Sequence, residues 1–218
     1  MTNHPVQALY TRKAKLYQRF FVDFLQWEKV LETFYQENNY LHPGMKILDA
    51  GCGTGSVTRA LYHLARYQKL EGITFYGFDL TPAMLDLFKE RMNKEGMHDI
   101  HLRSADVLDL ENQLPRDWTG YDLIVSSAML EYIPKEKLSQ ALVNLKRLLR
   151  EKGRMLLFVT RRTWITKWAG AKWWGANLFD LDELEMNLQQ AGLTPPQIMK
   201  LPAFWDAYLT AIDVSASL

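Results

Sequence analysis

The sequence ILDAGCGTG at residues 47–55 is typical of a short buried strand that ends in an acid and runs into a glycine-rich turn before a helix. Glycines at positions 51, 53 and 55 let the backbone turn sharply and approach a ligand closely. The helix that follows offers free N–H groups and the positive end of its dipole. A bare anion-binding loop disfavours a neighbouring carboxylate, so Asp49 indicates a ligand with a cationic end. Dinucleotide-binding folds also carry glycines after a strand, so later motifs must separate the two classes.

Further polar residues follow the later strands. Asp79 ends the expected strand 73–79 and lies 24 residues beyond Gly55, close to the spacing at which an acid meets ribose hydroxyls. A carboxylate suits this role because it accepts two hydrogen bonds from a vicinal diol. Asp106 follows the strand expected at 100–103, and Ser126 ends the strand expected at 121–126. Because ligands bind outside the carboxyl ends of parallel strands, we expect these residues to converge at one edge of a sheet.

The alternation of strand and helix signals predicts an α/β fold with a mainly parallel sheet covered on both faces. Expected strands are residues 45–49, 73–79, 100–103, 121–126, 154–160, 197–201 and 207–214. Expected helices include 56–67 and one that starts at Pro82, after the cap Thr81, and ends before Gly96. Another opens at Pro134, turns Leu149 inward and stops at Gly153. A last one carries Leu181, Leu184, Leu188 and Ala191 on one face.

These motifs, in this order and spacing, resemble the class I methyltransferases that depend on S-adenosylmethionine (SAM). The resemblance covers about residues 45–160 and implies a Rossmann-like, doubly wound sheet of seven strands with the last one antiparallel. It also implies SAM as cofactor and S-adenosylhomocysteine as product. By the resemblance, Asp49, Gly51 and Gly53 hold the methionine part of SAM, Asp79 takes the ribose hydroxyls, and Leu80 packs on the adenine.

The remaining implied contacts come from later motifs. Asp106 would accept the adenine amino group, the Val107 N–H would reach a ring nitrogen, and Ser126 would lie near the sulfonium. Helical periodicity from Tyr10 to about Asn39 predicts an amphipathic helix, and the family often places a lid there, which makes Tyr17 a further expected SAM contact. We therefore expect a helical lid over residues 1–42 and a SAM-binding domain over residues 43–218, within a single structural domain.

Composition excludes several other classes. The formal net charge of +1 creates no global field for nucleic acid, and Ser126 and the residues after it lack the Asn-Pro-Pro-Tyr motif of amino-methylating DNA enzymes. The single cysteine, Cys52, excludes a multi-cysteine metal site and reads as a space-filling residue of the turn. No apolar stretch reaches the roughly 20 residues of a membrane span, and the first eight residues lack the layout of a signal peptide. We expect a cytoplasmic protein without a bound metal.

Residues 145–175 combine nine basic residues and four tryptophans with a single acid, Glu151. Basic residues interleaved with tryptophan suit a membrane interface or an anionic, partly apolar acceptor. A solvated helix end followed by a partly buried aromatic lid is the alternative. The segment therefore predicts peripheral membrane contact or contact with the acceptor, and the alternative of a solvated helix end with an aromatic lid stays open.

The sequence is interpreted as a methyltransferase that acts on a small or lipid-like molecule. A SAM-binding sensor or partner subunit without turnover would keep the same cofactor residues. A nicotinamide-dependent oxidoreductase is disfavoured by Asp49 and by the lack of a hydride-acceptor site. Glu131 and Tyr132 follow the fourth strand and are the candidates for a general base, but packing roles explain them equally, so no catalytic residue is assigned. The acceptor, the methylated atom and the oligomeric state are not determined by the sequence.

Overall fold

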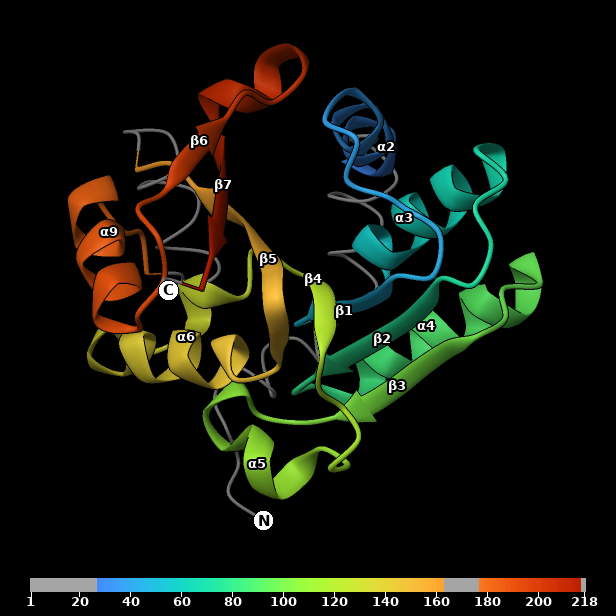
Figure 1. Cartoon of the computed structure of the whole chain (residues 1–218), viewed down its shortest axis with the longest axis horizontal. Helices are drawn as coiled ribbons and strands as arrows, with labels where there is room; N and C mark the ends of the chain where they lie inside the picture. Colours follow the sequence, from blue (N-terminus) through green and yellow to red (C-terminus); the bar gives the residue numbers. More distant parts are fainter. Residues whose placement is uncertain (1–26, 163–176, 217–218) are drawn as a thin grey trace. The chain divides into compact units, whose positions relative to one another are not determined.

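Seven strands form a sheet in the order β3-β2-β1-β4-β5-β7-β6. The computed structural model describes residues 27–162 and 177–216 (Figure 1). β7 runs antiparallel to both of its neighbours, and the other described pairings, β1 with β2, β2 with β3 and β4 with β5, are parallel. The predicted fold class, a mainly parallel sheet of seven strands with the last strand antiparallel, is confirmed. The chain divides into two compact units, one up to Asp106 and one from Val107.

The first unit places three parallel strands side by side, with helices alongside (Figure 1). Its elements are α2 (Trp27–Glu37), β1 (Lys46–Ala50), α3 (Ser56–Tyr67), β2 (Thr74–Asp79), α4 (Pro82–Glu95) and β3 (Ile100–Ser104). α2 packs on α3 through a buried face of Trp27, Leu31, Phe34 and Tyr35. This helix lies inside the predicted amphipathic stretch, whereas Tyr17 and the rest of the expected lid lie outside the described residues.

Local chemistry sets the boundaries of the helices beside the predicted site. α3 has the predicted bounds because its apolar residues recur on one buried face that includes Val57, Leu61 and Leu64. α4 starts at Pro82, where the missing N–H costs nothing, and ends at Glu95, because Gly96 after it adopts a left-handed φ of 63°. Both predictions are confirmed.

The second unit contains four strands of the sheet and the helices α6 and α9, which pack on each other. Its helices and strands are α5 (Leu110–Gln113), β4 (Tyr121–Ser127), α6 (Leu138–Lys146), β5 (Leu149–Thr160), α9 (Leu181–Gln190), β6 (Gln197–Met199) and β7 (Leu209–Ser215). Short 3-10 turns cover Val107–Asp109, Leu130–Tyr132, Lys135–Lys137 and Ala203–Ala207. α9 buries Leu184 and Leu188, but Leu181 is 50% exposed, so the prediction that Leu181 shares their face was wrong.

The predicted end of the helix after Pro134 was also wrong. α6 ends at Lys146, and Leu149 opens β5 opposite Tyr121. The register shifts between Tyr121 and Leu123, so the strand pairing resumes at Arg154. Gly153 lies inside β5. The position requires glycine, because a Cβ there would come within 2.6 Å of the Tyr121 carbonyl oxygen. The glycine is required by a close approach of two backbones, which a sequence cannot distinguish from a helix stop.

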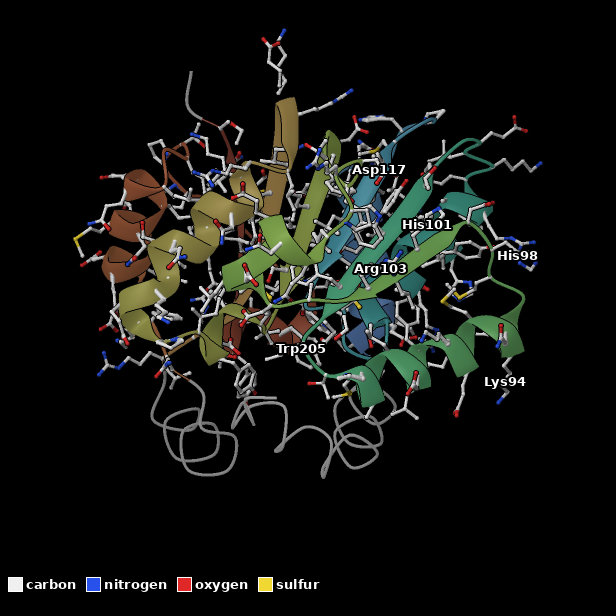
Figure 2. All side chains as sticks on the ribbon, turned by 90° about the horizontal axis from the view of Figure 1, so that it is seen from below. Lys94, His98, His101, Arg103, Asp117 and Trp205 are labelled. Atoms are coloured by element: carbon white, nitrogen blue, oxygen red, sulfur yellow. The ribbon has the colours of Figure 1, made fainter. Side chains whose placement is uncertain are left out.

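β3 forms one edge of the sheet and alternates between partly buried and exposed side chains. Ile100 and Leu102 pack beside Cys52, Leu85 and Phe88, whereas His101 and Arg103 are exposed (Figure 2). Charged side chains on an edge strand discourage pairing with another chain. Among the described helices, none is long and apolar enough to cross a bilayer. The described residues also contain no cluster of acids, histidines and cysteines that could hold a metal.

Candidate functional site

The glycine-rich turn leaves β1 and enters α3 through three left-handed glycines. Gly51, Gly53 and Gly55 have φ values of 72°, 51° and 89°, a region that side chains with a Cβ disfavour. The Phe78 carbonyl oxygen in β2 accepts the N–H groups of Gly51 and Cys52, each at 2.9 Å. The turn is therefore fastened to the neighbouring strand at its start.

Two glycines of the turn meet different surroundings. A Cβ built on Gly55 would lie 2.2–2.5 Å from three ring carbons of Phe88, so the α4 side chain forbids any larger residue there. A Cβ built on Gly53 would meet nothing within 4 Å. Gly55 thus serves packing behind the turn, and Gly53 leaves open space where a ligand could approach the backbone.

Asp49 lies near the end of β1 and is 2% exposed. Its Oδ2 accepts hydrogen bonds from the Thr58 N–H at 3.1 Å and from the Thr58 hydroxyl at 2.7 Å. The pKa of Asp49 is raised to about 7, chiefly by burial and to a smaller extent by the nearby Asp79 charge, while the Thr58 bonds oppose the rise. Burial disfavours the charged form of Asp49, and a cationic ligand beside it would stabilise that form.

Asp79 ends β2 and shapes the turn with both carboxylate oxygens. Oδ2 accepts the Gly53 N–H at 2.9 Å, and Oδ1 accepts the Thr81 N–H at 2.8 Å. Burial raises the pKa of Asp79, and these two backbone bonds oppose the rise. The Thr81 side chain also hydrogen-bonds this carboxylate. A carboxylate offers about four acceptor positions, so Asp79 can still accept a hydroxyl donor.

The other predicted residue after β2 and the acid after β3 continue the same edge. Leu80 follows Asp79 directly and is partly exposed. The Ala105 N–H donates to the Asp79 carbonyl oxygen at 3.1 Å, which ties the segment after β3 to the end of β2. Asp106 comes next and is partly exposed. The first unit therefore brings Asp49, Asp79 and Asp106 to the carboxyl ends of three adjacent strands.

The last two predicted cofactor contacts lie in the second unit. Val107 is buried, and its carbonyl oxygen accepts the Asn144 side-chain amide at 2.9 Å. Ser126 is 1% exposed near the end of β4, and its Oγ has no hydrogen-bond partner in the part of the chain that the structure describes. Burying a hydroxyl without a hydrogen-bond partner costs free energy, so the Ser126 hydroxyl is a candidate for a contact with a ligand.

Glu131 is buried and holds backbone segments together. Its Oε1 accepts the Thr160 N–H at 2.5 Å, and its carbonyl oxygen accepts the Asn177 N–H at 2.7 Å. The Asn177 side chain also donates to the Ile133 carbonyl oxygen at 2.9 Å. Burial raises the pKa of Glu131, and the Thr160 bond opposes the rise. These contacts give Glu131 a structural role, joining the segment after β4 to the end of β5.

Sequence reasoning missed Thr58 as a partner of Asp49. The available signal was a threonine that shares a helical face with apolar residues, because a buried hydroxyl there must find an acceptor. Cys52 was interpreted as space-filling, and it packs with Leu85 and Phe88. Burial and the charges of Asp49 and Asp79 raise its thiol pKa well above the usual value, so the thiol stays protonated.

The chain is similar in sequence to known methyltransferases. A family model described as a methyltransferase domain matches residues 41–176. The malonyl-[acyl-carrier protein] O-methyltransferase of Paenibacillus sp. is 34% identical over 115 residues, which cover 53% of this chain and 38% of that relative. The chain thus spans well under half the length of this curated relative.

Solved structures share the fold at low sequence identity. The magnesium protoporphyrin IX methyltransferase from Synechocystis, with bound SAH, has a TM-score of 0.63 at 19% identity, covering 88% of this chain and 83% of that one. A SAM-dependent methyltransferase from Aquifex aeolicus has a TM-score of 0.66 at 18% identity, covering 84% of this chain and 88% of that one.

Proposed function

We propose that this chain, which belongs to the methyltransferase-domain family, transfers a methyl group from SAM to a small-molecule or lipid-like acceptor. The observation that carries the proposal is the pair of buried or half-buried carboxylates, Asp49 and Asp79, on either side of a turn with open space at Gly53. Two of the proteins named above support such an acceptor, because the name of one states a carrier-bound malonyl group and the name of the other states magnesium protoporphyrin IX.

The described residues fit SAM better than they fit a dinucleotide. Asp49 is buried with a raised pKa, and a pyrophosphate beside it would add repulsion, whereas an ammonium would relieve the cost. Asp79 already bonds the Gly53 N–H, so a nucleoside held by Asp79 would lie against the open side of the turn. The buried Asp49 carboxylate and the open space beside Gly53 therefore both favour a cationic nucleoside as the ligand.

Each predicted contact has a specific chemical task in this proposal. Asp49, with the turn at Gly51 and Gly53, would hold the methionine ammonium and backbone of SAM. Asp79 would accept the ribose hydroxyls while Leu80 packs on the adenine. SAM supplies a methyl group that its sulfonium has already activated, so the chain has to align the acceptor and exclude water.

Further assignments rest on the family resemblance. Asp106 would accept the adenine amino group, and the Val107 N–H would donate to a ring nitrogen. Ser126 would lie near the sulfonium, and its buried hydroxyl without a described partner supports a polar role. Tyr17 would contact SAM from a helical lid over residues 1–42, with the SAM-binding domain over residues 43–218. A cytoplasmic location belongs to the same proposal and rests on the sequence.

Two rival functions make different predictions. A sensor or partner subunit would bind SAM without turnover, and a nicotinamide-dependent oxidoreductase would bind NAD. Calorimetric titration of the whole chain with S-adenosylhomocysteine and with NAD is expected to show binding of the first alone.

Incubation with labelled SAM and a panel of small and lipid-like acceptors is expected to give a labelled product. Binding without any product would favour the sensor, and binding of NAD alone would overturn the proposal.

Peripheral membrane contact through residues 145–175 is a separate part of the proposal. Its tryptophans lie outside the described residues, while Arg147, Arg150, Lys152 and Arg154 are exposed. We expect sedimentation with vesicles that contain anionic lipids at low salt, less at about 0.5 M salt because screening weakens the attraction. Lys167→Gln with Lys172→Gln should reduce the bound fraction, and Lys94→Gln, an exposed residue on α4 (Figure 2), should leave it unchanged. A lack of sedimentation at low salt would rule out the membrane contact, and the alternatives would then be a contact with an anionic acceptor or a solvated helix end followed by an aromatic lid.

A further inference from the structure

A half-buried ion-pair network joins α2 to the helices that flank the glycine-rich turn. Glu28, in the first turn of α2, pairs with Arg59 of α3 and with Arg91 of α4, the latter at 3.4 Å. The side chains of Glu28, Arg59 and Arg91 are 20%, 15% and 12% exposed. Arg59 also pairs with Glu95 at 2.6 Å. The network therefore balances two carboxylates against two guanidinium groups within the first unit.

The network reaches the turn on both sides of Gly55. Arg91 Nη1 donates to the carbonyl oxygen of Thr54 at 3.3 Å, and Thr54 is 3% exposed. The Ser56 side chain, at the start of α3, hydrogen-bonds the Glu28 carboxylate. A single acid on α2 thus contacts Ser56 directly and Thr54 through Arg91. Gly55 between them has no side chain to cap α3.

These ion pairs are better suited to fixing the position of the turn than to raising the free energy of unfolding. Burial raises the pKa of Glu28, and Arg59 and Arg91 oppose the rise without cancelling it. Ion pairs taken out of water add little net stability, because the cost of desolvation offsets their attraction. Here each charge also contacts a second group, Arg59 at Glu28 and the Thr54 carbonyl oxygen at Arg91, so the pairs constrain the segments that they join. A negative charge near the start of α3 also complements the positive end of the helix dipole.

We propose that Glu28 and Arg91 are positioning residues that hold the glycine-rich turn in its ligand-binding shape and make that shape depend on the docking of α2. The inference deepens the proposed function, on which it rests. Removal of either charge would release the Thr54 carbonyl or the start of α3. The Gly53 N–H, which Asp79 also holds, would then sample other positions.

Hydrogen exchange tests the coupling without any ligand. In Glu28→Gln and in Arg91→Met, the amides of residues 51–58 are expected to exchange at least about threefold faster than in the parent chain. Glu37→Gln, exposed at the end of α2, and Lys89→Gln, 57% exposed on α4, serve as matched controls and should leave these amides unchanged. Arg91→Lys, which keeps the charge, should restore part of the protection. Unchanged exchange in both test variants would overturn the coupling.

Calorimetry with S-adenosylhomocysteine then tests the positioning role. The dissociation constant is expected to rise about tenfold in Glu28→Gln and Arg91→Met and to stay unchanged in the two controls. A lower melting temperature with an unchanged dissociation constant would assign the network to stability alone and overturn the role. If Glu28→Gln fails to fold, Glu28→Asp replaces it in both measurements. If the parent chain does not bind the nucleoside, the proposed function fails, while the exchange experiment still decides the coupling.

Discussion

Asp49→Asn is expected to stabilise the ligand-free protein at neutral and alkaline pH and to weaken SAM binding by roughly a hundredfold. Burial places the pKa of Asp49 at about 7, above its unfolded value, so the folded chain carries an ionised, desolvated carboxylate above that pH. Asparagine keeps an oxygen that can accept the Thr58 bonds but carries no charge. The variant therefore avoids the cost of burial and loses the partner for the SAM ammonium.

The sign of the pH dependence follows from linkage. Because the folded pKa is raised, the folded chain binds more protons than the unfolded chain between about pH 4 and pH 7, and Asp49 lowers the stability as the pH rises through this window. The free energy of unfolding of Asp49→Asn should exceed that of the parent by up to about 4 kcal/mol above about pH 7 and by almost nothing near pH 4. Denaturant unfolding at several pH values measures this difference.

The same carboxylate should make SAM binding depend on pH in the parent chain. SAM affinity is expected to increase as the pH rises from about 6 to 7.5, because only the ionised Asp49 pairs with the ammonium, and binding near pH 7 should release protons. Thr33→Ala, an exposed substitution on α2, is a suitable control with parent-like behaviour. Asp49→Asn that is no more stable than the parent at about pH 8 and binds SAM equally well would contradict this role.

Asp79→Ala is expected to weaken binding of S-adenosylhomocysteine by about a hundredfold or more, because hydrogen bonds to a charged group contribute about 1.5–3 kcal/mol each. The substitution also leaves the Gly53 and Thr81 N–H groups without their acceptor, so the turn loses its present shape. Calorimetry measures the affinity. The matched control is Asp86→Ala, an exposed acid on α4 that pairs with Lys89.

A 2′-deoxy analogue of S-adenosylhomocysteine separates the two roles of Asp79. The parent chain should bind the analogue less tightly than the full nucleoside, because Asp79 then lacks a hydroxyl donor. In Asp79→Ala the two ligands should bind equally, since the acceptor is gone. If the analogue loses the same affinity in both chains, Asp79 shapes the turn but does not hold the ribose, and that part of the assignment is wrong.

Residues with a fixed local chemistry were predictable from the sequence. The turn at 51–55 required glycine, and all three glycines adopt left-handed backbone. Pro82 and Gly96 delimited α4 correctly, because an imino acid and a residue without Cβ suit only a few positions in a helix. Alternating strands and helices predicted the parallel sheet, and the family resemblance supplied its last antiparallel strand.

Features that depend on long-range contacts were not predictable. Gly153 resembled a helix stop, and its actual reason is the Tyr121 carbonyl across the sheet. Asp79 was predicted as a ligand for sugar hydroxyls, yet the structure shows it holding Gly53, 26 positions earlier in the chain. Glu131 was a candidate base, and its carboxylate is engaged by the Thr160 N–H.

The sequence by itself determined the order of the elements, the glycine-rich turn and the acids that follow the strands, because each depends on residue type and local spacing. Only the tertiary structure decided which groups those acids contact and what their burial does to their charge. Thr58 bonding to Asp49, and Glu28 joining Arg59 and Arg91, arise when helices pack beside one turn. Such contacts depend on the distance between side chains far apart in the chain, and burial, which sets the cost of each charge, exists only after folding.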